Sequence, residues 1–201
     1  MGTRNLTMVI HQQEPKIAQY GQWDGYPSGQ GSTALRFLFK MMNENKLDEF
    51  KKRLESLRWI TKEEGEKLDA MDDWKSKYPY LSRNAGADIL NAVLFNQMEV
   101  SEGITGRKEI PVEVEFLSDA REFAGDSLFC EWAYVIDLDN ETFEVYEGFN
   151  KQPLNESDRF FSLQKEEGGY KPVRLVKSYS LRDLPSHSQM INDCSPSDSE
   201  E

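Results

Sequence analysis

The strongest constraint on the fold is a change of hydrophobic period along the chain. Residues 3–10 and 16–20 are short runs rich in β-forming residues, and a turn-like segment that ends at Pro15 joins them. Apolar residues then recur at helical spacing from about residue 32 to 94, and strand-like patterns return from residue 112. Strands at both ends of a helical middle predict an α+β fold. We expect the terminal strands to form one mainly antiparallel sheet, with about four helices inserted between them on one face.

Several of these elements have recognisable boundaries. Four helices are expected, over residues 32–43, 46–58, 61–77 and from about 82 to 94. Ser32 or Thr33 can cap the first, because a hydroxyl oxygen can accept a hydrogen bond from a backbone N–H of the first turn. Thr61 and Glu64 have the spacing of a capping box at the start of the third, and Pro79 stops it. The later strands are expected at 112–116, 128–138, 142–148 and 173–179.

Length and composition indicate one domain and few options for cofactors. A chain of 201 residues is long enough to bury a substantial core. We expect a single domain over residues 1–185 and a disordered acidic tail over 186–201. No apolar run is long enough to cross a bilayer, and the two cysteines suggest reduced thiols in a cytoplasmic protein. Two histidines and two cysteines make a zinc site improbable, so we expect no metal and no cofactor.

The net charge of −12 argues against binding to a nucleic-acid backbone. The charge is concentrated in residues 99–147, which contain fourteen Asp and Glu but only three Lys and Arg. Such a segment can present an acidic face to a basic host protein, or it can simply keep the surface solvated. Asp137 and Asp139 lie at the tip of a predicted hairpin, where solvent-exposed turn carboxylates are expected.

The candidate functional segment is the loop over residues 20–31, between the second strand and the first helix. It combines four glycines and a proline with side chains that a connector does not need. These are Tyr20, Gln22, Trp23, Asp24, Tyr26, Ser28 and Gln30, with Gly31 closing the loop. The aromatic rings can stack on a flat ligand, while the amide and carboxylate groups read its edge. Backbone N–H groups over 28–33 can cradle an anion at the start of the helix, although neither the Walker A motif nor the dinucleotide fingerprint is present.

A purely structural reading of the same loop remains open. In that reading the glycines serve only tight turns, and the aromatic rings close the core. Arg4, Arg83 and Asn84 are further candidates for contacts with an anionic ligand, or else ordinary surface and capping residues.

The start of the chain resembles two groups of proteins. Gly2-Thr3 before a strand is faintly similar to N-terminal-nucleophile hydrolases, in which an exposed Thr acts as its own base. That likeness makes Thr3, with Asp24, a weak catalytic candidate, but Met1 and Gly2 precede Thr3 and block its amine. The openings MGTRNLT and QYGQWDGYPSGQG, with the run over 133–139, resemble a family of uncharacterised proteins of phages, bacteria and some fungi. This resemblance implies a phage-type source and importance of the loop, but no ligand.

Three functions are therefore considered. The first is capture of a small anionic or nucleotide-like molecule by the loop, which in a phage would sequester a host immune signal. The second is inhibition of a host partner through the acidic face over 99–147. The third is hydrolysis on a fold like that of N-terminal-nucleophile hydrolases; we lean against an enzyme.

Overall fold

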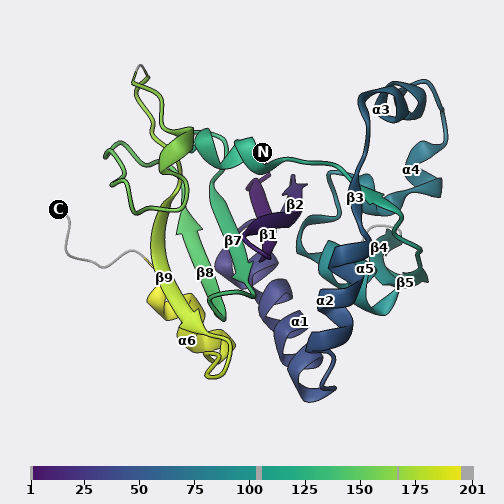
Figure 1. The fold of residues 1–201 in the computed structure, drawn as a ribbon, viewed down its shortest axis with the longest axis horizontal. Coiled ribbons are helices and arrows are strands. Elements are labelled where there is room, and N and C mark those ends of the chain that lie inside the picture. Colours follow the sequence, from purple (N-terminus) through teal and green to yellow (C-terminus); the bar gives the residue numbers. More distant parts are fainter. Residues whose placement is uncertain (1, 103–105, 167, 196–201) are drawn as a thin grey trace.

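A five-stranded sheet forms the centre of the molecule (Figure 1). The computed structural model describes residues 2–102, 106–166 and 168–195. The strands are β1 (Asn5–His11), β2 (Glu14–Gly21), β7 (Trp132–Asp137), β8 (Thr142–Glu147) and β9 (Arg174–Ser180), in the order β2-β1-β7-β8-β9. β1 and β7 are parallel, and the other neighbours are antiparallel. The predicted α+β fold with a mainly antiparallel sheet of terminal strands is confirmed.

The interior of the sheet is buried on both faces. All seven residues of β1 are buried. Its backbone is hydrogen-bonded to β2 on one side and to β7 on the other, and its side chains enter two separate cores. Leu6, Met8 and Ile10 point into one core, and Val9 points into the other. Alternate residues of a strand point to opposite faces, so a strand covered on both sides buries all of its side chains, polar ones such as Thr7 included.

Helices cover one face of the sheet. They are α1 (Ser32–Asn43), α2 (Leu47–Ser56) and α5 (Ile89–Phe95), together with α6 (His187–Asp193) after the last strand. α1 has the predicted bounds, and Leu35 and Leu38 of its apolar stripe are completely buried. The opposite face is covered by 3-10 turns, η4 (Arg121–Gly125) and η5 (Phe161–Leu163), and by the long connection before β9.

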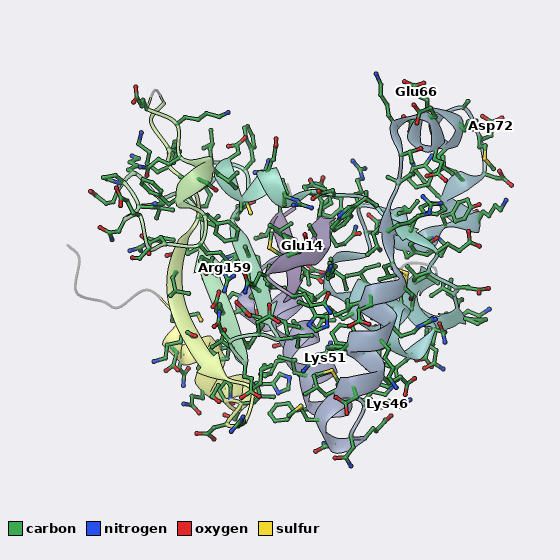
Figure 2. The ribbon with its side chains drawn as sticks, viewed as in Figure 1. Glu14, Lys46, Lys51, Glu66, Asp72 and Arg159 are labelled. Carbon is green, nitrogen blue, oxygen red and sulfur yellow. The ribbon has the colours of Figure 1, made fainter. Side chains whose placement is uncertain are left out.

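A peripheral arm extends from the helical layer (Figure 1). It contains α3 (Lys62–Asp69) and α4 (Trp74–Lys77), and Glu66 and Asp72 mark its outer part in Figure 2. The capping box of Thr61 and Glu64 is present with both of its hydrogen bonds. The single helix predicted over 61–77 is wrong, since the chain turns at residues 70–73 and divides it in two. α3 buries none of its residues, so no core contact extends it further.

The segment between α5 and η4 differs most from the expectation. The strand predicted over 112–116 is absent there, and only β6 (Phe116–Leu117) pairs, with β3 (Arg58–Trp59). Instead β4 (Gln97–Glu102) and β5 (Gly106–Pro111) form a hairpin. The hairpin was missed because β5 is polar and almost entirely exposed, and because the alternation in β4 rests on only two apolar residues, Met98 and Val100.

Three more short turns complete the described elements. They are η1 (Pro27–Gly31), a π-helical turn, and the 3-10 turns η2 (Pro79–Leu81) and η3 (Gly86–Asp88). A turn over 82–84 and η3 occupy the start of the predicted fourth helix, so α5 begins later than expected, at Ile89.

The disordered tail expected from residue 186 is also corrected in part. Ser186 caps α6 by accepting a hydrogen bond from the Gln189 N–H at 3.2 Å, and Met190 and Cys194 are buried. Residues 196–201 lie outside the described part of the chain. Within the described ranges, every helix is too short or too polar to span a membrane.

Candidate functional site

The loop over residues 20–31 is tied to the sheet by its backbone. The Gly25 N–H donates to the Thr3 carbonyl at 2.9 Å, and the buried Tyr134 hydroxyl of β7 donates to the Gly25 carbonyl at 2.7 Å. Asp24, just before, has a positive φ of 55°, which turns the chain toward η1 and α1. The loop is therefore a fixed piece of structure that sits on the sheet.

The glycines of the loop serve close packing. A Cβ at Gly31 would lie 2.8 Å from the Tyr134 ring, and a Cβ at Gly29 would lie 2.1 Å from the Asp24 carbonyl oxygen. Real Cβ atoms do not approach other atoms so closely, so only glycine fits at either position. This part of the structural reading accounts for the glycines, but it does not account for the aromatic side chains.

The anion cradle predicted over 28–33 is closed. The N–H groups of Gly29 and Gly31 donate to the Tyr26 carbonyl, and the Gln30 N–H donates to the Asp24 carbonyl at 2.8 Å. The predicted caps are also wrong: the Ser32 hydroxyl donates to the Pro27 carbonyl and the Thr33 hydroxyl donates to the Gly29 carbonyl. Because η1 runs directly into α1, the helix has no open first turn with N–H groups directed at a ligand.

A cavity of about 460 Å³ lies beside the loop. Its walls come from three parts of the chain: the loop, the outer side of α1, and the segment from residue 84 through α5 to the β4–β5 hairpin. Trp23, Asp24, Gln30 and Asn84, all predicted as ligand contacts, line it together. Asn84 and the loop residues, which are far apart in the sequence, thus lie around one cavity of the size that small-molecule sites have.

Trp23 is a fixed aromatic surface at the rim of this cavity. Its side chain is 47% exposed, although a ring this large normally gains stability by burial. The indole Nε1–H donates to the Asn84 Oδ1 at 3.1 Å, which fixes the ring. Gly2 packs against the ring, since a Cβ there would fall 2.2 Å from Trp23 Cε3.

Gln30 joins the loop to the opposite wall. Its Oε1 accepts a hydrogen bond from the Ala87 N–H at 2.7 Å, and its Nε2 donates to the Trp23 carbonyl at 3.4 Å. Gly86, which precedes Ala87, has a φ of +50°, and a Cβ there would meet Gln30 Oε1 at 2.4 Å. Gln30 is therefore a structural contact that holds the cavity wall, and its amide is largely occupied.

Other predicted contacts lie away from the cavity. The Tyr20 hydroxyl donates to Gln22 Oε1 at 2.6 Å, and the Tyr20 ring packs edge-on against Phe123, on the side of the sheet opposite the helices. Burial raises the pKa of Tyr20. The Arg4 guanidinium pairs with Glu131 at 3.3 Å.

Three more predicted contacts are outside the set of residues that line the cavity: Tyr26, Ser28 and Arg83. All three are exposed. Gly31 contributes its close contact with Tyr134 and lies outside that set as well.

Apart from Asn84, the residues of the other two walls were missed in the sequence analysis. Arg36 and Lys40 of α1 line the cavity, as do Asp88, Glu99 and Arg107. Spacing was the available signal for the first two, since residues four apart on a helix share a face. Asp88 accepts hydrogen bonds from Asn91 Nδ2 at 2.9 Å and from the Glu99 N–H, and burial raises its pKa.

The weak catalytic candidates do not form a reactive group. Thr3 is 7% exposed and its carbonyl binds the loop, while Asp24 is exposed at the cavity. The expectation that Asp137 is a solvated turn carboxylate is wrong, because its side chain is buried and pairs with Arg159 at 2.6 Å. Asp139 remains exposed and accepts the N–H groups of Gln12 and Gln13.

The acidic segment is partly neutralised in three dimensions. Among the described residues, seven of its fourteen acids form ion pairs with arginines: Glu99, Asp119, Glu131, Asp137, Glu141, Glu144 and Glu147. Four of the arginines come from outside residues 99–147: Arg4, Arg159, Arg174 and Arg182. The linear run of charge therefore overstates the acidity of any one face.

In the described part of the chain, no group of three or more His, Cys, Asp and Glu side chains is placed to hold a metal ion. The groups that the cavity offers to a ligand are therefore aromatic, amide and charged side chains. Comparison of the chain with protein-family models, curated proteins and solved structures finds no match.

Proposed function

We propose that the protein binds a small anionic or nucleotide-like molecule in the cavity beside the loop over residues 20–31. The observation that carries the proposal is the position of Trp23. A large ring that is half exposed, held by Asn84 and supported by Gly2 is organised before any ligand arrives. Pre-organisation of this kind removes part of the entropy loss that binding would otherwise require.

The polar side chains around Trp23 favour a flat ligand with hydrogen-bonding groups at its edge. Asp24 is exposed beside it, and its carboxylate can accept hydrogen bonds from ring or exocyclic N–H groups. Nucleobases combine a stacking face with such an edge. If the source is a phage, as the resemblance of the opening motifs suggests, the ligand would be a nucleotide signal of the host.

A titration with a panel of nucleotides and cyclic dinucleotides tests the proposal, with isothermal calorimetry and ligand-induced shifts of the melting temperature as readouts. Trp23→Ala is expected to weaken binding about 5- to 150-fold, since stacking contributes about 1–3 kcal/mol per base. Tyr26→Ala is the matched control, because Tyr26 is 55% exposed in the same loop but does not line the cavity. Equal losses in both variants, or no binding to the native protein by any member of the panel, would refute the proposal.

A further inference from the structure

The α1 wall of the cavity is cationic. Arg36 and Lys40 both line it, and they lie about 6 Å apart along the helix axis because each residue advances the helix by about 1.5 Å. The Arg36 Nη2 donates to the Thr33 hydroxyl at 2.9 Å, and Lys40 Nζ lies 3.8 Å from the centre of the Phe95 ring. Among the described residues, neither cation forms an ion pair with a carboxylate.

In the part of the chain that the structure describes, two of the four acids that line the cavity are engaged by other groups of the protein. Glu99 pairs with Arg107 at 3.1 Å, and Asp88 accepts hydrogen bonds from Asn91 and from the Glu99 backbone. Asp24 lies beside Trp23, and Glu109 lies on the hairpin wall. Two like charges four residues apart on a helix repel each other, so a bound anion would relieve a cost already present in the empty protein.

These positions give the cavity two different ends. Trp23, Asp24 and Asn84 form one, at the loop before α1, and Arg36 and Lys40 form the other, one and two turns along the helix. We infer that the ligand is a nucleoside phosphate, with its ring on Trp23 and its phosphate at Arg36 and Lys40. This inference rests on the proposed function and adds the ligand class and orientation. Arginine and lysine are the side chains that bind phosphate most often in proteins.

The test compares three probes by calorimetry: nucleosides, the corresponding nucleoside 5′-mono- and diphosphates, and pyrophosphate. Native protein is expected to bind at least one nucleotide at least tenfold more tightly than its nucleoside, with an affinity that falls as salt is added. Arg36→Gln/Lys40→Gln is expected to abolish that difference and leave binding of the nucleoside unchanged. Trp23→Ala is expected to weaken the nucleoside and the nucleotide equally.

The control is Lys62→Gln/Lys67→Gln on α3, which removes the same two charges from exposed positions on the peripheral arm. It corrects for the change in net charge, and thermal unfolding of each double variant confirms that it is folded. If nucleotides bind the native protein and Arg36→Gln/Lys40→Gln with equal affinity, the orientation is refuted while the proposed function stands. If no probe binds the native protein, both are refuted. If pyrophosphate binds and Trp23→Ala has no effect on nucleotides, the assignment of the ring end is refuted.

Discussion

The ionic cluster around Arg159 leads to the most direct prediction about stability. Arg159 belongs to the long connection before β9 and lies against the strands β7 and β8 (Figure 2). Its Nη2 binds Asp137 of β7 at 2.6 Å and Glu144 of β8 at 2.8 Å, and its Nε binds Glu144 again at 2.8 Å. The Tyr146 hydroxyl donates to the same Glu144 at 2.6 Å.

Removing the guanidinium would leave two poorly solvated carboxylates unpaired. The side chains of Asp137 and Glu144 are 2% and 11% exposed, and that of Arg159 is 23% exposed. Loss of one partner from a buried ion pair costs about 3–5 kcal/mol, and the partial exposure of Arg159 favours the lower end, about 3 kcal/mol. For a chain of this size, that corresponds to a fall in melting temperature of about 6–12 °C.

Thermal and urea unfolding of Arg159→Gln measure this loss. Arg182→Gln is the control, because the pair between Arg182 and Glu141 has the same 2.6 Å distance but side chains that are 77% and 46% exposed. We expect no resolvable shift in that variant, since exposed pairs are screened by water. Adding Asp137→Asn and Glu144→Gln to Arg159→Gln should restore at least half of the lost stability, because no unpaired charge then remains. Equal shifts in the two single variants would refute the role given to burial.

Three further predictions follow from particular contacts. Gly86→Ala should lower the free energy of unfolding by more than about 1 kcal/mol, because Gly86 has a positive φ and lies against Gln30. Gly65→Ala should raise it by about 0.5–1 kcal/mol, because Gly65 lies in α3 with open space around it. A change of the same sign in both variants, measured by urea unfolding, would contradict this prediction. Burial raises the pKa of Asp137, but hydrogen bonds from Asn140 and Arg159 outweigh it and hold the pKa below its usual value. The stability that ionised Asp137 contributes should therefore be complete above about pH 4, the pKa of Asp137 in the unfolded chain, and should decline as the pH falls through its lower pKa in the folded protein. Between pH 2 and 6, the free energy of unfolding should fall less steeply with decreasing pH in Asp137→Asn than in the native protein. Identical pH profiles for the two proteins would argue against this role. Burial raises the pKa of both the Cys130 and the Cys194 thiol, to about 11 for Cys194. A thiol reagent at pH 8 should therefore label neither cysteine until urea unfolds the protein. Rapid labelling of the native protein would contradict the buried placement.

Much of the fold could be predicted because its strongest elements are locally consistent. α1 combines good helix formers with an apolar stripe, and its predicted and observed bounds agree. The strands β7 and β8 are rich in aromatic and β-branched residues and were found within a few residues of their ends. The β4–β5 hairpin could not be found in this way, because β5 is polar and exposed at nearly every position and β4 contains only two apolar residues, Met98 and Val100.

The candidate site was predicted in part for a related reason. The unusual composition of the loop drew attention to Trp23 and Asp24, which do line the cavity. Composition cannot say where a backbone N–H is directed, so the anion cradle was expected where η1 in fact closes on itself. Nor can it say that Tyr20 and Gln22 bond to each other and lie away from the cavity.

The sequence by itself determined the strands at both ends of a helical middle, the bounds of α1, and the glycine-rich connection that introduces it, because these follow from local period and steric freedom. Only the tertiary structure decided the parallel pairing of β1 with β7, the burial of Asp137 against Arg159, and the meeting of Trp23 with Asn84, Arg36 and Lys40 around one cavity. Those contacts join residues far apart in the chain, and their energies depend on burial and distance, which no local pattern of side chains contains.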